Sequence, residues 1–493
     1  MELSPIVALA IPAVGAFLIG LAGRWPNLRE TITMATAASL FAVVVQLVPF
    51  ALDGATHEYV LGSIVPRLRL ELHIEPLGMI FALIASSLWI LNSIYSIGYM
   101  RGNKEKHQTR FYICFALSIT SVMGLAFSGN LLTMFVFYEA LSLATFPLVT
   151  HKGTPDAMRS GRTYLGILVG TSVCLFLPAI IATWVYAGTL DFRPGGVFDN
   201  ALEAGELSPA LFGVIFAMFM YGIGKAALMP SQRWLPAAMV APTPVSALLH
   251  AVAVVKAGVF SLTKVTVYTV GIDTLRAYGQ GEWLVFVAGF SIVAASFIAL
   301  FQDNLKRRLA YSTVSQLSYI TLGAALLTPV SVAAAALHIA AHAFGKITLF
   351  FAAGSIYTAA HKTLVSQLDG IGRRMPWTMG AFTVGTLSMI GLPPTAGFVS
   401  KWYLVSGAWA DAQPYAIVVI VLSTLLNAAY FLPIVYRAFF RAPPAPGHHE
   451  HAHGEAPLPI VIALTCTAAA AVGMFFVPGI FHELAFALAG SLP

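Results

Sequence analysis

The sequence predicts an all-α polytopic membrane protein with about fourteen transmembrane helices. The 493-residue chain is 58% hydrophobic and only 10% charged, whereas soluble domains carry about 25% charged residues. Apolar stretches of about 20 residues, the length that crosses a bilayer, recur along the chain. The formal net charge is +6, but Lys and Arg lie in the loops between these stretches and form no basic face, which argues against nucleic-acid binding.

The apolar stretches give the helices in order. The first, SPIVALAIPAVGAFLIGLAG, has no basic segment before it and is expected to be a retained helix, not a signal peptide. The segments 236–270 and 376–408 exceed a simple span, and each has internal Pro and Gly. The predicted spans are 4–22, 31–52, 76–98, 111–128, 130–150, 163–188, 210–230, 236–270, 283–301, 308–327, 330–358, 376–408, 414–436 and 457–479.

The charges of the loops agree with this number of spans. Segment 101–110 has four basic residues and one acidic residue, and segments 151–162, 302–308 and 361–374 each have three basic and one acidic. The loop 190–209 has one basic and four acidic residues. With fourteen spans, the positive loops share one side and the negative loop lies on the other. The positive-inside rule then predicts a protein of the cell inner (plasma) membrane with both termini outside the cytoplasm.

Two segments between spans have their own patterns. Segment 57–75 alternates apolar and polar residues, which predicts a short β-hairpin on the outer face. The loop 441–457 is rich in Pro and, at 447–453, in His. A divalent metal site there is one interpretation, and a flexible solvated loop is the favoured one. No metal or cofactor is predicted, because no C-x-x-C occurs and the three cysteines lie in separate apolar spans: Cys114, Cys174 and Cys466.

Ionisable residues interrupt the apolar spans at five positions: Glu139, Lys225, Lys256, Lys346 and Lys401. A charge at the bilayer centre costs roughly 2.5–3.5 kcal/mol on insertion scales. One such residue is explained by packing, but five, three of them beside Gly or Pro, favour a path along which charge moves. Glu139 is expected to pair with a buried Lys and so remain charged. The alternative is a structural Glu satisfied by hydroxyl groups such as those of Tyr138 and Ser142.

The first half of the chain places its basic groups around a predicted helix break. Lys225 lies five residues before Pro230, and a break at membrane depth is tolerated only beside a polar cavity or within protein. His250 and Lys256 are six residues apart. Because imidazole titrates near neutrality, His250 is either a relay between the two lysines or a structural residue. Lys264 shares the face of Lys256 near the span end and is expected to be a supporting charge.

The second half has a parallel set. His338, His342 and Lys346 are spaced i, i+4 and i+8, so they lie on one helix face. Two histidines at this spacing can bind zinc, but no third ligand is near, and proton hopping suits the row better. Lys401 follows a second predicted break at Gly391 and the two prolines after it.

The two sets predict an internal repeat. Lys225 comes 114 residues after the start of the fourth span, and Lys401 comes 118 after the start of the ninth. Five helices in each half would make the two repeats inverted in topology, as in many transporters. The sequence therefore predicts four parts. Residues 1–110 form an N-terminal three-helix segment with the hairpin, residues 111–270 and 271–440 form the two five-helix repeats, and residues 441–493 form the His-rich loop and the last helix.

Four sequence motifs resemble one superfamily. KAALMPSQRWLPAAMVAPTPVSALLHAVAVVKAG and QDNLKRRLAYSTVSQLSYI are similar to signatures of the antiporter-like subunits of respiratory complex I, membrane-bound hydrogenases and Mrp-type cation/proton antiporters, in the last case of the D-like type. HIAAHAFGKITLFFAAGSI and GLPPTAGFVSKW are similar to later signatures. The resemblance covers about residues 75–440. It implies a fourteen-helix fold with two inverted repeats, broken in the seventh and twelfth helices.

The resemblance also implies roles for the buried residues. Glu139 and Lys225 match the family's buried Glu–Lys pair, and Lys256 matches the linking Lys of the eighth helix. The remaining matches are His338, His342 and Lys346 in the eleventh helix and Lys401 toward the outer half-channel. Arg233 and Ala238 depart from the His and Asp of many members, which argues against a cytoplasmic relay through that loop. No long lateral helix is expected after the last span.

Three functions compete. The favoured one is a proton- or monovalent cation/proton-translocating subunit of a multi-subunit membrane complex, of Mrp type, with other membrane subunits as partners. The alternative within this class is a membrane subunit of a complex I-like NADH-quinone oxidoreductase or hydrogenase pump. A redox subunit with its own centre is disfavoured, because the sequence has no G-x-G-x-x-G after a strand and no cysteine ligand set. A self-sufficient transporter is disfavoured by charges that form a line across several helices.

Overall fold

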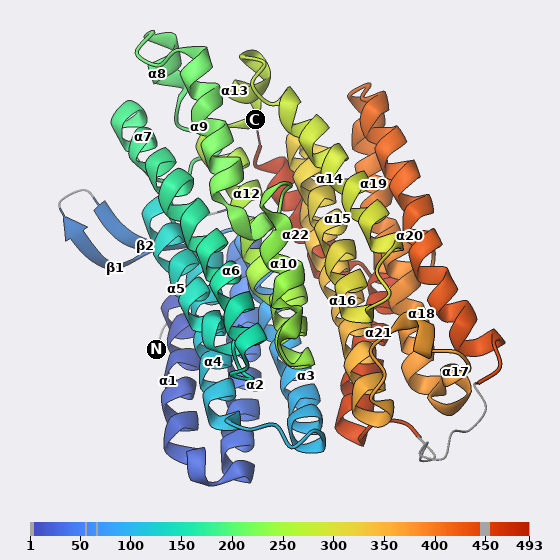
Figure 1. The fold of residues 1–493 in the computed structure, drawn as a ribbon. Helices are drawn as coiled ribbons and strands as arrows, with labels where there is room; N and C mark the ends of the chain where they lie inside the picture. Colours follow the sequence, from blue (N-terminus) through green and yellow to red (C-terminus); the bar gives the residue numbers. More distant parts are fainter. Residues whose placement is uncertain (1–3, 55–56, 66–67, 444–453, 493) are drawn as a thin grey trace.

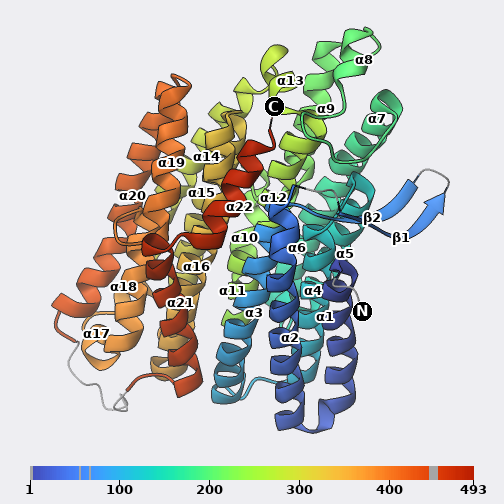
Figure 2. The same cartoon turned by 180° about the vertical axis from the view of Figure 1, so that it is seen from behind.

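The computed structural model describes residues 4–54, 57–65, 68–443 and 454–492. Long helices lie side by side, and one hairpin projects from the bundle (Figures 1 and 2). The elements are α1 (Pro5–Leu21), α2 (Pro26–Leu52), β1 (His57–Val65), β2 (Leu68–Ile74), α3 (Pro76–Gly102), α4 (Gln108–Ala126), α5 (Leu131–Val149), α6 (Pro155–Thr171), α7 (Leu177–Ala187), α8 (Asp199–Glu203), α9 (Pro209–Gly222), α10 (Trp234–Ala237), α11 (Thr243–Ala247), α12 (Val254–Val265), α13 (Ile272–Ala277), α14 (Glu282–Leu300), α15 (Leu305–Ala325), α16 (Pro329–Ala360), α17 (Ile371–Arg374), α18 (Pro376–Ile390), α19 (Ala396–Ala410), α20 (Pro414–Phe440), α21 (Leu458–Phe476) and α22 (Gly479–Gly490).

The polytopic all-α fold is confirmed. Among the described residues, 11 helical segments are long and apolar enough to cross a membrane. The polar helix α15 and the interrupted segments α9–α10 and α18–α19 are outside that number. If these three segments also cross the membrane, the total is the fourteen transmembrane helices that the sequence predicts. The number of fourteen stays a prediction.

Proline sets the start of many of these helices. It occupies the first position of α2, α3, α6, α9, α16, α18 and α20. At that position its missing N–H costs no hydrogen bond, and its fixed φ already suits a helix. Before three of them, the hydroxyl oxygen of Thr154, Ser208 or Thr328 accepts a hydrogen bond from the backbone N–H three residues on. Local sequence therefore fixes where the chain enters these helices.

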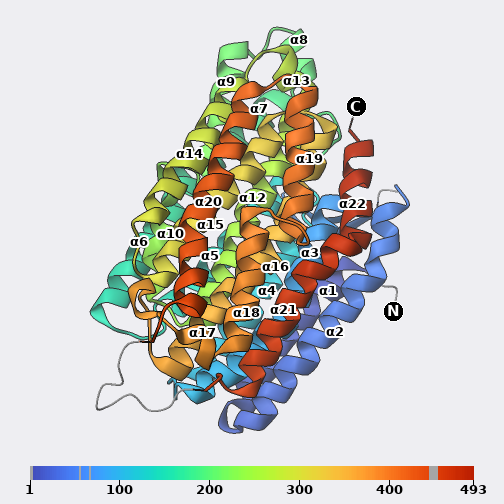
Figure 3. The same ribbon diagram turned by 90° about the vertical axis from the view of Figure 1, so that its right-hand side faces the viewer.

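Two helical segments form the centre of the bundle. The most apolar 18-residue stretch is wholly buried in Thr243–Val270 and also in Pro329–Ala360. In Pro155–Ala187, by contrast, only 28% of the corresponding stretch is buried. The second segment is α16, which packs against α3, α15, α18, α19, α21 and α22 (Figure 3). Its many Ala, Gly and Ser residues let neighbouring backbones approach closely. The segments that carry most of the predicted His and Lys residues are thus shielded from lipid.

The predicted hairpin is confirmed. β1 and β2 are antiparallel, with His57 opposite Ile74 and Val65 opposite Leu68. The base of β2 is tied to the α4–α5 turn, because the His73 backbone N–H donates to the Phe127 carbonyl at 2.7 Å. Glu75 follows directly and leads into α3.

The two interrupted helices run in opposite directions. α9 begins at the upper end of the bundle in Figure 1, near α8, whereas α18 begins at the lower end, near α17. The α3–α4 turn also lies at the lower end, so the positive segments 101–110 and 361–374 share one side. This arrangement is what inverted repeats require.

Candidate functional site

The first interruption places Lys225 in the interior. α9 ends at Gly222, and a 3-10 turn over Gly224–Ala226 carries Lys225. Gly258 of α12 lies against this turn, since a Cβ on Gly258 would be 2.2 Å from the Ala226 nitrogen. The glycine therefore lets α12 approach the break two residues beyond Lys256. Lys225 is fully buried.

Lys225 is held by α5. Its Nζ donates to the Tyr138 carbonyl at 2.8 Å and to Ser142 Oγ at 2.7 Å, and it lies 3.2 Å from the centre of the Tyr138 ring. The Tyr138 hydroxyl accepts from the Lys225 backbone N–H at 3.0 Å. The ammonium thus has two polar acceptors and an aromatic face, which offset the cost of its burial.

The expected direct pair between Glu139 and Lys225 is absent from the ion pairs of the described residues. The two residues are nevertheless close, because Lys225 contacts Tyr138 and Ser142 on either side of Glu139. Glu139 Oε1 is buried and has no hydrogen-bond partner within the described chain. Among the described residues, no hydroxyl group donates to Glu139 Oε1 either, so the alternative of a carboxylate satisfied by hydroxyl groups is not seen at this oxygen.

The two halves of the chain meet at α12 and α16. Lys256 Nζ lies 2.5 Å from His342 Nδ1, and both residues are fully buried. His250 is buried as well, with its ring 4.8 Å from that of Phe350 on α16. Neither ring nitrogen of His250 has a hydrogen-bond partner among the described residues. Most buried polar side chains have a hydrogen-bond partner, so an unpaired buried imidazole is an exception that a functional role would explain.

The row on α16 is present, and each member has a different partner. His338 Nδ1 lies 2.8 Å from Ser400 Oγ, and its Nε2 lies 3.0 Å from Gln316 Oε1. Lys346 Nζ donates to Ser312 Oγ at 2.8 Å. The His338 and His342 rings are 6.3 Å apart. The face predicted from the spacing is therefore lined by hydroxyl and amide groups from α15 and α19.

The second interruption holds Lys401. α18 ends at Ile390, Gly391 follows with a positive φ of 88°, and α19 starts at Ala396. Lys401 Nζ donates to the Met389 and Ile390 carbonyls at 3.0 and 2.9 Å. These carbonyls belong to the last turn of a helix and lack intrahelical partners, and a cation there is favourable. Gln316 Nε2 also donates to Met389 O, at 3.4 Å, which links Lys401 to His338.

The sequence did not predict three polar partners in the site: Gln316, Ser312 and Ser400. The polarity of α15 could have indicated the first two, because this helix is too polar to count among the apolar spans and is nevertheless almost wholly buried. A polar helix inside a membrane bundle must direct its polar groups at other helices. Within the described residues, no group of three or more His, Cys, Asp or Glu side chains is placed to hold a metal ion. The histidines of 447–453 lie outside the described residues.

Comparison with known proteins gives one family. Residues 128–427 match the family described as NADH:quinone oxidoreductase/Mrp antiporter, TM. NADH-quinone oxidoreductase subunit N of Desulforudis audaxviator (strain MP104C) is 32% identical over 452 residues, which cover 90% of this chain and 88% of that protein. A probable K(+)/H(+) antiporter component (A/B) of Rhizobium meliloti (strain 1021) is 30% identical over 83% of this chain, which spans 41% of that longer protein.

Two solved structures share the fold. A chain of the archaeal membrane-bound sulfane sulfur reductase superposes with a TM-score of 0.86 at 21% identity, covering 100% of this chain and 98% of its own length. A chain of the Mrp complex from Dietzia sp. DQ12-45-1b superposes with a TM-score of 0.85 at 20% identity, with the same coverage. These likenesses concern the fold alone.

Proposed function

Because this chain belongs to the family of NADH:quinone oxidoreductase and Mrp antiporter transmembrane subunits, we propose that it translocates protons within a multi-subunit membrane complex. The observation that carries the proposal is the Lys256–His342 contact, which joins the basic groups of the two halves inside the bundle. In the proposed path Lys225 and Glu139 precede this contact, and His338 and Lys401 follow it.

The chemistry requires only acid–base groups. A buried amine or imidazole changes its proton affinity when a neighbouring charge appears or moves away. Protonation of Lys256 in contact with His342 would therefore bias the protonation of the next group along α16. His250, with both ring nitrogens unpaired among the described residues, is a proposed relay beside this contact. Direct hydrogen bonds and short water bridges would carry the proton between groups.

The test uses the assembled complex that contains this chain, reconstituted in vesicles, with proton movement followed by a pH-sensitive dye. We expect Glu139→Gln and Lys225→Ala each to lower proton translocation by roughly a hundredfold or more, the size of a lost proton-transfer group. The matched control is Arg159→Ala, which removes an exposed charge at the start of α6. Near-normal translocation in both buried-site variants, with the complex assembled, would reject the proposal.

We favour Mrp-type exchange of a monovalent cation for protons, because such exchange needs only the buried acid–base groups that the chain carries. The similarity to subunit N over 88% of that protein supports a second candidate, a redox-driven complex of the complex I type. The driving force for proton movement distinguishes Mrp-type exchange from a redox-driven complex. A Na⁺ or K⁺ gradient alone should drive proton movement in the first case, and only a quinone-linked electron donor should do so in the second.

A further inference from the structure

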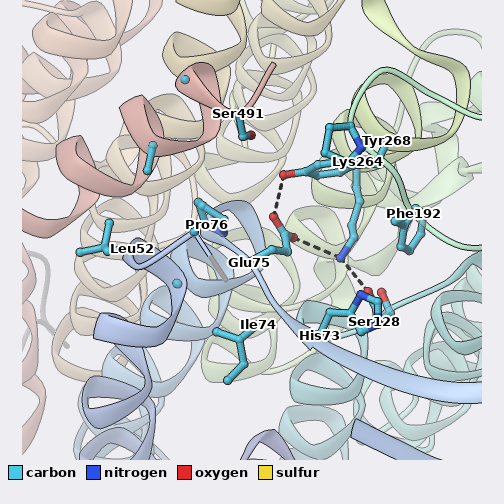
Figure 4. A pocket seen from close by; sticks show the side chains of 15 residues that line it. Leu52, His73, Ile74, Glu75, Pro76, Ser128, Phe192, Lys264, Tyr268 and Ser491 are labelled. Atoms are coloured by element: carbon cyan, nitrogen blue, oxygen red, sulfur yellow. Dashed lines mark hydrogen bonds and ion pairs between the residues drawn. The ribbon is translucent and has the colours of Figure 1, made fainter. Parts of the chain in front are cut away.

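A pocket of about 540 Å³ lies where β2, α3, α12 and the end of α22 come together (Figure 4). It is on the face of the bundle that carries the hairpin, because Ile74 and Glu75 join β2 to α3. Lys264, Tyr268 and Glu75 line it, together with His73 and Ser491. None of these residues belongs to the path described above.

Glu75 is the centre of this cluster. Its carboxylate accepts hydrogen bonds from the backbone N–H groups of Leu77 and Gly78 at 3.0 and 2.8 Å, and from the Tyr268 hydroxyl at 3.1 Å. Lys264 Nζ forms an ion pair with its Oε1 at 3.1 Å. Four donors match the capacity of an ionised carboxylate, so Glu75 is held in one position as a fixed negative charge.

Lys264 has one donor left for the pocket. The side chain is only 1% exposed, and its Nζ donates to the Ser128 carbonyl at 2.7 Å in addition to Glu75. An ammonium carries three donors. The third has no hydrogen-bond acceptor among the described residues. Phe192, another residue that lines the pocket, has its ring centre 4.7 Å from Nζ.

The pocket also contains a basic group on the side of the hairpin. Burial, with the nearby charge of Lys264, lowers the pKa of His73 below its ordinary 6.5, against the opposing charges of Glu58, Asp191 and Glu75. His73 is therefore neutral near pH 7, and its Nε2 has no hydrogen-bond partner among the described residues. A neutral imidazole with a free nitrogen can accept a proton.

Lys264 is connected to the central contact through α12. It lies eight residues after Lys256, so the two share one helix face. Ser261 comes between them in the sequence, about one turn before Lys264, and is fully buried. Its Oγ has no hydrogen-bond partner within the described chain, although most buried hydroxyl groups have one. A hydroxyl group can accept one proton while it releases another.

We propose that Lys264 is a proton-exchange port between Lys256 and the pocket on the hairpin face, an inference that rests on the proposed function. In the outward step the Lys264 Nζ–H bond breaks and the proton passes to water in the pocket or to His73. A proton from Lys256 then restores Lys264, with Ser261 receiving one proton and passing on its own. The Glu75 carboxylate holds the returning ammonium in place.

The competing explanation is a static ion pair that fastens α12 to the base of the hairpin. The variant Lys264→Arg, tested in the assembled complex, distinguishes the static ion pair from the proton-exchange port. Arginine keeps the charge and the pairing with Glu75, and the pocket gives it room, but it does not release its proton. We expect Lys264→Arg to assemble with a normal melting temperature and to translocate protons at least about tenfold more slowly. Wild-type translocation in this variant would overturn the port.

A second pair of variants tests the same idea without touching the ion pair. Ser261→Ala should slow translocation, whereas Thr263→Ala on the same helix should not, because the Thr263 hydroxyl already donates to the Val259 carbonyl at 2.9 Å. If the Lys264→Arg complex fails to assemble, the comparison of Ser261→Ala with Thr263→Ala tests the port instead. Equal translocation rates in these two variants would reject the port. If Lys225→Ala abolishes translocation while Lys264→Arg does not alter it, the port fails and the proposed function stands.

Discussion

Lys256 of α12 and His342 of α16 are in direct contact, with Nζ 2.5 Å from Nδ1. The two residues are 86 positions apart in sequence, and each belongs to a different predicted repeat. Both lie on the helical segments that are wholly buried. The contact therefore joins the two predicted repeats in a part of the bundle that is shielded from lipid.

The first prediction concerns this pair. We expect Lys256→Met and His342→Ala each to lower proton translocation by roughly a hundredfold, and the double variant to be little worse than either one. Residues that act as one unit are strongly non-additive. The measurement is a double-mutant cycle of initial rates in vesicles. If the rate losses of the two single variants multiply in the double variant, the two residues act separately.

The second prediction concerns the support of Lys225. Ser142→Ala removes one of its two hydrogen-bond acceptors and leaves a buried ammonium short of a partner. A hydrogen bond to a charged group contributes about 1.5–3 kcal/mol, so we expect translocation to fall about tenfold or more. Ser118→Ala is the matched control, since that hydroxyl donates to the Cys114 carbonyl of its own helix. Equal rates in the two variants would argue against this role.

The third prediction concerns close packing at the first break. Gly258→Ala would place a Cβ 2.2 Å from backbone atoms of Lys225 and Ala226, so the turn has to move. Overpacking of this kind costs about 1–3 kcal/mol, and we expect a lower melting temperature and lower translocation. Gly166→Ala is the control, because a Cβ there has no neighbour within 4 Å. Thermal unfolding of the detergent-purified complex measures both.

The fourth prediction concerns pH and the pair of Asp369 with Arg437, which lies in the last turn of α20. Arg437 Nε donates to Asp369 Oδ1 at 2.7 Å, and this bond, aided by the Arg437 and Arg441 charges, keeps the pKa of Asp369 below its ordinary 3.8. A lowered folded-state pKa stabilises the protein above pH 3.8, and this contribution is lost as the pH falls through the folded value.

Asp369→Asn should therefore lower the melting temperature at about pH 7, and the difference from the wild type should close at low pH. The pair is about a quarter exposed, so the effect should be no more than about 2–4 °C. Asp303→Asn should show the same trend with pH, because the hydrogen bond from Ser366 also lowers the pKa of Asp303. A difference for Asp369→Asn that persists unchanged at low pH would contradict the assignment.

Features with a local signal were predictable from the sequence. Pro and Gly marked the breaks beside Lys225 and Lys401, the spacing of His338 and His342 placed them on one face, and alternation marked the hairpin. The partners were less predictable. A backbone carbonyl such as that of Tyr138 leaves no mark in the sequence, and the partnership of Lys256 with His342 depends on how distant helices pack. Only the polarity of α15 signalled that Gln316 faces inward.

The hairpin has a consequence for work with the isolated chain. In the described residues its sheet has two strands, so each strand has one edge whose backbone N–H and C=O groups lack a strand partner. The edge of β2 is covered from Arg69 to His73 by the α4–α5 turn and the start of α5, which leaves the edge of β1. Such open edges pair readily with another strand. Purified alone and concentrated, the chain is therefore prone to edge-to-edge aggregation through β1, which a proline on that strand's free edge should suppress.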